Sequence, residues 1–126
     1  MTAKPTGLML VAAAMAVESF AQMFLKIGAG GGPRILSQRF RDLAGRSRLG
    51  RSAGAWIGLG IAAYALEILL YTLALHRLDV SVAFPLGSLC FVGVAILSQW
   101  LLGEAVGPIR WLGVACILAG TVFLAL

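Results

Sequence analysis

The chain has 126 residues, of which 60% are hydrophobic and only 12% are charged, and its formal net charge is +5. Soluble globular domains are about 45–50% apolar and about 25% charged, so this composition excludes a water-facing globular surface. It also excludes intrinsic disorder, because disordered segments are poor in apolar residues and rich in charge. The length is that of a single domain, and residues 1–126 are treated as one.

Four apolar segments follow one another, at about residues 7–27, 54–75, 80–102 and 109–126. Each is close to the roughly 20 residues that a helix needs to cross about 30 Å of hydrocarbon. Backbone groups in lipid must bond within their own segment, so we expect helices rather than strands. The sequence therefore predicts an all-α membrane protein, a bundle of four transmembrane helices. The first segment begins like a signal peptide, but its apolar run continues past the candidate cleavage site at Ala16, so we expect it to be retained.

The connection at residues 28–53 is long and basic, whereas the other two are short turns that join antiparallel neighbours. It contains one aspartate and six arginines, namely Arg34, Arg39, Arg41, Arg46, Arg48 and Arg51. Eight of the ten lysines and arginines, including Lys26 and Arg110, fall on the side of this loop. Positive charge collects on the cytoplasmic side of membrane proteins. We therefore expect a multi-pass membrane protein with loop 28–53 in the cytoplasm and both termini on the outer side.

The basic loop has two interpretations. It is an ordinary positive-inside loop, or, because Leu36, Phe40 and Leu43 recur at helical spacing, a short helix lying on anionic lipid. In either case Arg34, Arg39 and Arg41 would attract phosphate or lipid head groups. Nucleic-acid binding is not expected, because the arginines belong to no soluble module.

Two carboxylates lie near the middle of predicted membrane helices, Glu18 in the first and Glu67 in the second. A charge at the bilayer centre costs at least about 2.5–3.5 kcal/mol, so such residues are candidates for function by default. A carboxyl group at that depth can take up a proton and a cation in turn, which is the minimum chemistry of proton-coupled antiport. The structural alternative is that each protonated carboxyl makes a hydrogen bond between helices.

Other polar residues share the faces of these carboxylates. Gln22 and Lys26 follow Glu18 at intervals of four residues, and Tyr71 follows Glu67 at the same interval. Residues four apart lie on one helical face, and a tyrosine can donate a hydrogen bond to a carboxylate or present its ring to a cation. We assign all of these residues to a substrate or proton pathway.

Pro85 and Ser88 mark a polar, flexible region in the third predicted helix. Proline removes a helical hydrogen bond, and broken helices line the substrate path in many transporters. The alternative is a tolerated kink. We place both residues in the same pathway.

Small residues recur every fourth position, at Gly54, Gly58 and Ala62 in the second segment and at Cys116 and Gly120 in the fourth. Such stripes bring helix backbones close, within the chain or across a dimer. Cys90 and Cys116 are expected to be small buried hydrophobic residues. No metal-binding, cofactor-binding or catalytic motif is present, so we expect neither an enzyme nor a cofactor.

Three sequence runs carry a resemblance to a known family: AFPLGSLCFV at 83–92, LGE at 102–104 and PIRWLGV at 108–114. They resemble subunits of the 4-amino-4-deoxy-L-arabinose-phosphoundecaprenol flippase, in the drug/metabolite transporter (EamA-like) superfamily. Small multidrug resistance proteins belong to the same superfamily. The flippase subunits have a glutamine followed four residues later by a lysine, which Gln22 and Lys26 match.

The chain departs from that resemblance at both carboxylates. Glu18 precedes Lys26 by eight residues, the spacing of the membrane-embedded glutamate and a lysine in small multidrug resistance proteins. Glu67 is expected in neither group, so the chain combines features of both branches.

The resemblance implies a transporter subunit of the bacterial inner (plasma) membrane, with its termini in the periplasm. It further implies that the subunit moves a lipid-linked amino sugar and contributes to modification of lipid A in lipopolysaccharide. It also implies a homo- or heterodimer with another four-helix subunit. One alternative is a proton-coupled exporter of organic cations that uses Glu18. A third, from a different class, is a membrane scaffold or accessory subunit that does not transport.

Overall fold

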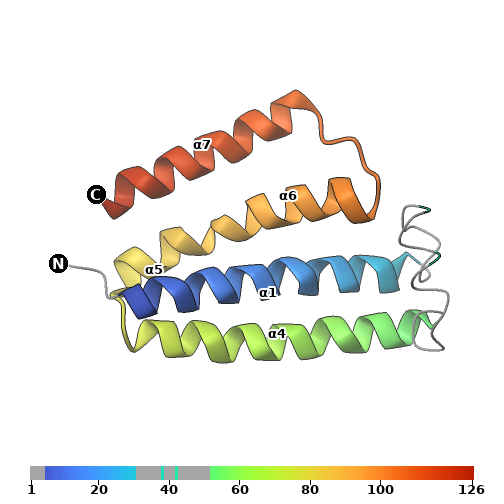
Figure 1. Cartoon of the computed structure of the whole chain (residues 1–126), viewed down its shortest axis with the longest axis horizontal. Coiled ribbons are helices and arrows are strands. Elements are labelled where there is room, and N and C mark those ends of the chain that lie inside the picture. The colour runs from blue at the N-terminus through green and yellow to red at the C-terminus, as the bar shows by residue number, and fades with distance from the viewer. Residues whose placement is uncertain (1–4, 31–37, 39–41, 43–51) are drawn as a thin grey trace.

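The structure, a computed structural model, describes residues 5–30, 38, 42 and 52–126. Within these residues the main helices are α1 (Pro5–Ala29), α4 (Ala53–Leu75), α5 (Val80–Gly87), α6 (Leu89–Leu101) and α7 (Pro108–Ala125). The start of α1 and the end of α7 lie at one end of the molecule, and the α6–α7 connection lies at the other (Figure 1).

The predicted apolar segments are helical, and their boundaries agree with the structure to within about two residues in the first, second and fourth. Three spans are long and apolar enough to cross a membrane: α1, α4 and the stretch Val80–Leu101 formed by α5 and α6. The apolar helix Pro108–Leu124, in α7, is shorter. The all-α membrane fold is confirmed.

The third predicted helix is broken at Ser88, between α5 and α6. Pro85 lies inside α5 and has no N–H to donate within the helix. The Pro85 carbonyl instead accepts from the Ser88 N–H at 3.1 Å and from the Ser88 hydroxyl at 2.6 Å. The helix is thus interrupted three residues after Pro85, and the Ser88 backbone and side chain both bond to the Pro85 carbonyl there.

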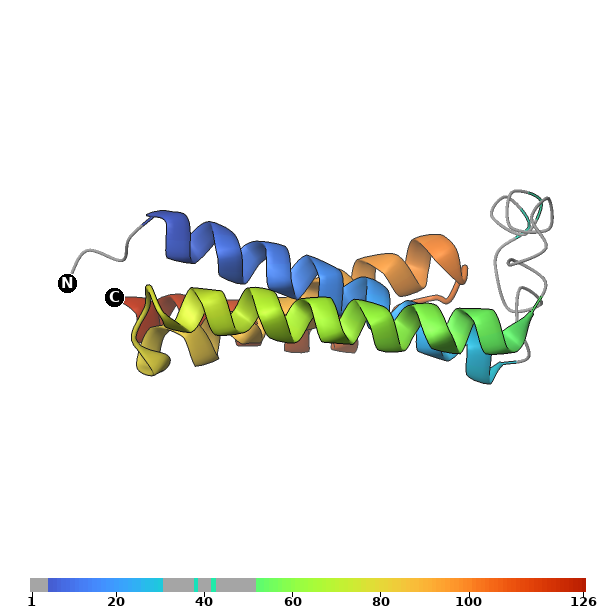
Figure 2. The ribbon, with the colours of Figure 1, turned by 90° about the horizontal axis from the view of Figure 1, so that it is seen from below.

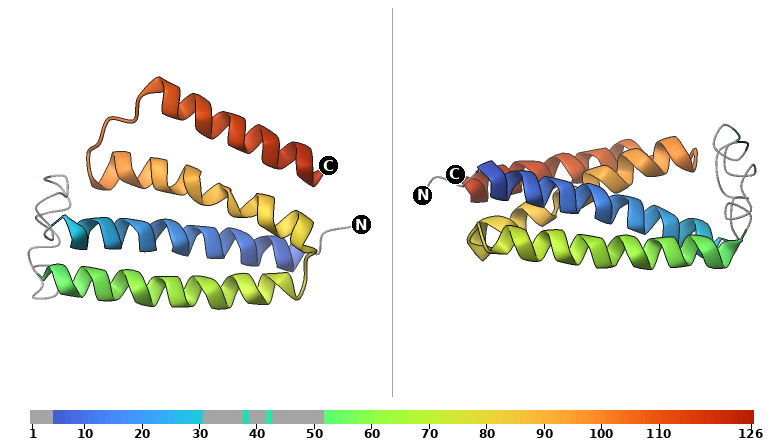
Figure 3. Two further views of the ribbon diagram at one scale, coloured as in Figure 1. Left: turned by 180° about the vertical axis from the view of Figure 1, so that it is seen from behind. Right: turned by 60° about the horizontal axis from the view of Figure 1, so that its bottom comes forward.

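The helices lie in a row, in the order α4, α1, α5 with α6, and α7 (Figure 1). α1 packs against α4, α5 and α6, whereas α7 at the edge contacts mainly α5 and α6. The other views show α1 crossing α4 at an angle (Figures 2 and 3). Most buried apolar residues accordingly belong to α1, and the outer helices turn leucine, isoleucine and phenylalanine side chains outward, as expected in lipid.

Close helix packing occurs at glycines other than those of the predicted stripes. A Cβ added to Gly60 of α4 would lie 2.8 Å from Leu25 Cδ2 on α1, and one added to Gly93 of α6 would lie 2.9 Å from Ser19 Cβ. Gly58 and Gly120 have nothing within 4 Å of such an atom. The predicted stripes therefore do not form contacts within the chain, because they lie on helix faces that point away from the neighbouring helices.

Candidate functional site

A groove of about 340 Å³ lies where α1, α4, α5 and α6 meet, and both predicted carboxylates line it. Its lining residues come from four helices and the break between two of them: Met15, Glu18, Glu67, Tyr71, Phe84, Gly87, Ser88 and Phe91. The structure brings together four residues that the sequence assigns to one pathway, namely Glu18, Glu67, Tyr71 and Ser88.

Helical spacing explains how the carboxylates reach one groove. Glu67 and Tyr71 are four residues apart on α4, so they share a face. Met15 and Glu18 are three apart on α1, which crosses α4 and turns that face toward it. The chain direction changes slightly at Ser88, so the end of α5 and the start of α6 close the third side.

The groove carries two negative groups and no described cation. Glu18 and Glu67 face this groove together with the Tyr71 hydroxyl. Among the described residues the ion pair found is Lys26–Glu104, outside this groove. The groove is therefore suited to receive a cationic or proton-carrying group.

Two aromatic rings form the rim of the groove, and they are open to the surroundings. Phe84 is 75% exposed and Phe91 is 56% exposed. The groove therefore opens sideways on the membrane-facing surface of the chain, and a group can enter it while the rest of its molecule stays in lipid.

A polar cluster lies at the opposite end of the helices from the chain termini. The Lys26 ammonium in the last turn of α1 pairs with Glu104 Oε1 at 2.6 Å. The Ser98 hydroxyl, at the end of α6, donates to Glu104 Oε2 at 2.5 Å. Gly103 has a φ of 65°, a conformation that glycine adopts without steric cost, and it turns the chain so that Glu104 faces α1.

The hydrogen bond from Lys26, followed by that from Ser98, holds the pKa of Glu104 below its ordinary value. The stability that this contact contributes is present at neutral pH and is lost as the pH falls through the lowered pKa. We expect Lys26→Gln to raise the midpoint of the Glu104 carboxyl, measured by carboxyl-carbon NMR titration in micelles. The matched change Arg77→Gln, at the other end of the helices, should leave that midpoint unchanged. Equal midpoints in the Lys26→Gln variant and the parent chain would contradict the assigned cause.

The other predicted site residues do not line the groove. Gln22 is exposed on α1 one turn beyond Glu18, and Lys26 is engaged with Glu104. Pro85 shapes the break but is not part of the groove wall. Arg34, Arg39 and Arg41, like the Leu36–Leu43 pattern, lie outside the described residues. The prediction for the cysteines was wrong, since Cys116 is exposed and Cys90 is half-buried beside Glu18.

Comparison with known proteins identifies the chain's family. The model of the EamA-like transporter family matches residues 6–126. The chain belongs to this family.

This EamA-like transporter is also similar to curated proteins from several bacteria. A probable 4-amino-4-deoxy-L-arabinose-phosphoundecaprenol flippase subunit ArnE of Pseudomonas savastanoi pv. phaseolicola is 40% identical over 65 residues, which are 52% of this chain and 57% of the relative. The protein of the same name from Shigella flexneri serotype 5b is 41% identical over 69 residues, or 55% of this chain and 62% of the relative. These alignments cover less than two thirds of either relative. No solved structure matches the chain significantly.

Several lining residues of the transporter were not predicted as site residues. Met15 precedes Glu18 by one helical turn, so the helical spacing used for Gln22 and Lys26 would have found it if applied in the other direction. Phe84 and Phe91 flank the break at Ser88, and their only signal in the sequence was their position beside Pro85 and Ser88. Thr121 of α7 was also missed, although its hydroxyl is 2.6 Å from the Ser88 hydroxyl.

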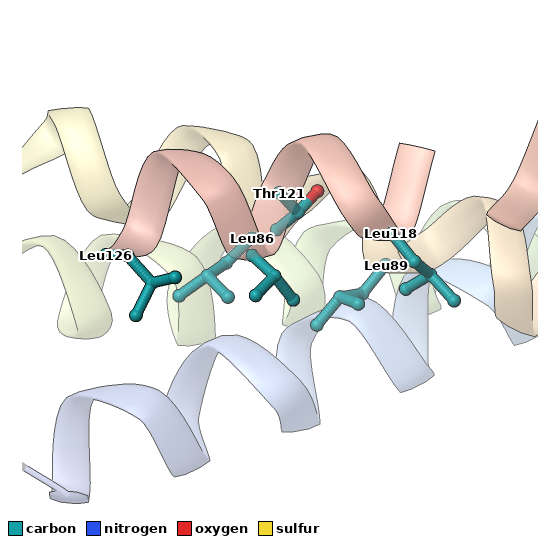
Figure 4. A pocket seen from close by; sticks show the side chains of 6 residues that line it. Leu86, Leu89, Leu118, Thr121 and Leu126 are labelled. Atoms are coloured by element: carbon teal, nitrogen blue, oxygen red, sulfur yellow. The ribbon is translucent and has the colours of Figure 1, made fainter. Parts of the chain in front are cut away.

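A second pocket, of about 340 Å³, lies between α5, α6 and α7 and is almost entirely apolar. Leucine side chains from the three helices line it, and Thr121 supplies its hydroxyl (Figure 4). It contains no carboxylate, so in polarity it contrasts with the groove around Glu18.

Proposed function

We propose that the chain is a subunit of an inner-membrane flippase for an undecaprenyl phosphate-linked amino sugar of the aminoarabinose type. The observation that carries this proposal is an exposed groove with two carboxyl groups that form no ion pair among the described residues. An amphipathic lipid can place a cationic sugar head group between Glu18 and Glu67 while its tail remains in the bilayer. The similarity to flippase subunits supports this choice of substrate.

Each part of the groove has a role in this proposal. The carboxylates accept charge-assisted hydrogen bonds from the sugar amine, and such bonds are stronger than neutral ones. Phe84 and Phe91 cover the bound cation with their rings. The Ser88 and Tyr71 hydroxyls contact the sugar hydroxyls. The arginines of loop 28–53, on the cytoplasmic side, concentrate the anionic lipid at the membrane surface.

We also propose that the chain acts with a second four-helix subunit. The described helices form an open row (Figure 1), and the groove's rim residues Phe84 and Phe91 are exposed. The curated relatives are named as subunits. A partner that covers the exposed faces of α4 and α7 would complete the substrate path.

The test measures the substrate on the outer face of the membrane. Spheroplasts of a deletion strain and of the same strain carrying the gene are treated with an amine reagent that does not cross membranes. We expect deletion to abolish labelling of the amino-sugar lipid and its transfer to lipid A, while the total extracted amount of the lipid does not fall. Unchanged labelling and unchanged lipid A after deletion would overturn the proposed substrate.

The lack of an ion pair at Glu18 and Glu67 within the described part of the chain also favours a second function, proton-coupled export of small organic cations. In that case tetraphenylphosphonium added to proteoliposomes should drive proton release from the carboxylates. Proton release without any effect of deletion on lipid A would favour this exporter over the flippase. If variants of Glu18 and Glu67 match the parent chain in both the lipid-labelling assay and the proton-release assay, the scaffold would remain as the function.

A further inference from the structure

We propose that Glu104 is an internal ligand that occupies an anion-binding site formed by Lys26 and Arg110, and that a phosphate group displaces it. The inference rests on the proposed function, since it assigns a site to the phosphate of the lipid-linked substrate.

Two cations from different helices act on one carboxylate at this position. Lys26 in the last turn of α1 makes the direct contact at 2.6 Å, and Arg110 in the first turn of α7 adds its electrostatic attraction. Two positive groups and one negative group leave a net positive site. The Glu104 carboxylate therefore stands where an external anion with several acceptor oxygens would sit.

The Lys26–Glu104 ion pair is exposed, so another anion can replace the carboxylate. The side chains of Lys26 and Glu104 are 46% and 42% exposed, and an ion pair this exposed is weak. Glu104 is carried by the turn at Gly103, so its side chain can leave without disturbing a helix. A phosphate that takes its place can accept a charge-assisted hydrogen bond from Lys26, and the charge of Arg110 adds to the attraction.

The position along α1 separates this site from the carboxylate groove. Lys26 follows Glu18 by eight residues, a rise of about 12 Å in an α-helix. The two sites therefore lie at different levels along α1. In this proposal they are occupied in turn: the phosphate is captured at the loop end, and the amine then reaches the groove.

The experiment measures the affinity of the purified full chain in nanodiscs for farnesyl phosphate, in a double-mutant cycle of Lys26 and Glu104. We expect Glu104→Gln to bind it about two- to fivefold more tightly than the parent chain, the range that removal of an exposed ion-pair competitor allows. Lys26→Gln should weaken binding, and adding Glu104→Gln to that variant should then have no further effect. Asp79→Asn, which removes a carboxylate from the α4–α5 turn at the other end, is the matched control and should leave affinity unchanged.

Two further probes distinguish the source of the phosphate. A gain in the Glu104→Gln variant for farnesyl phosphate alone assigns the site to a lipid phosphate, and the same gain for inorganic phosphate assigns it to free phosphate. Both results support the anion site. Equal affinities in the variant and the parent, a gain that persists without Lys26, or an equal gain for uncharged farnesol would overturn it. If Glu104→Gln does not fold, Ser98→Ala loosens Glu104 without removing its charge and should give a smaller gain in the same direction.

These outcomes separate the site from the proposed function, because the probes carry no amino sugar. The expected changes in phosphate affinity, observed in a chain that does not move the amino-sugar lipid, would refute the proposed substrate and leave the anion-binding site standing. Normal amino-sugar transport with no Glu104 effect on phosphate binding would refute the site alone.

Discussion

Replacing Glu18 with glutamine is expected to slow transport of the lipid-linked amino sugar by about 10- to 100-fold. The substitution keeps the size of the side chain and removes its charge, which faces the groove beside Glu67 and Cys90. A hydrogen bond to a charged group is worth about 1.5–3 kcal/mol, and about 1.4 kcal/mol corresponds to a factor of ten. The measurement is the outer-face labelling of the amino-sugar lipid in spheroplasts.

The control for this variant is Asp79→Asn, the same chemical change at the exposed turn between α4 and α5. It should transport at the parent rate. Normal transport by the Glu18 variant would exclude Glu18 from the substrate path. If the variant instead transports normally but loses proton release driven by organic cations, the groove belongs to the exporter and not to the flippase.

The second large effect concerns stability: Gly60→Val should lower the free energy of unfolding by about 1–3 kcal/mol, the usual cost of overpacking a close contact. A Cβ at Gly60 would lie 3.2 Å from the Ala21 carbonyl oxygen and 2.8 Å from the Leu25 side chain, and valine adds two methyl groups there. Backbone on α1 cannot move aside as a flexible side chain can. Unfolding by titration with sodium dodecyl sulfate in mixed micelles measures the effect.

Gly58→Val is the matched control, two residues away on the same helix and with nothing within 4 Å of the added Cβ. Both substitutions change intrinsic helix propensity by the same amount, so the difference between them isolates the contact with α1. Equal unfolding free energies for the two variants would show that Gly60 does not pack against α1 as described.

The helices and the groove carboxylates could be predicted because each rests on a strong local signal. A long apolar run has few stable forms in lipid other than a helix, and a carboxylate within such a run stands out. It was harder to predict which face of α4 packs against α1. Gly58 and Gly60 look alike in the sequence, and only the crossing of α1 over α4 decides that Gly60 is packed and Gly58 is open.

The Lys26–Glu104 pair was not predicted, although both residues were noticed. They are 78 positions apart, and their contact depends on the left-handed turn at Gly103 and on where α6 ends. Local spacing carries no information about such a pair. The same holds for Cys90, which reads as an apolar residue in its own helix and meets Glu18 only through the packing of α6 on α1.

The Ser88 side chain lines the carboxylate groove, and its hydroxyl also lies 2.6 Å from the Thr121 hydroxyl on α7. Thr121 also donates to the Pro85 carbonyl at 3.3 Å. A subunit that pulls α7 outward would break the Ser88–Thr121 contact and leave the Ser88 oxygen open to a hydrogen bond from the groove. Docking on the edge helix would then add one polar group to the groove without displacing either glutamate.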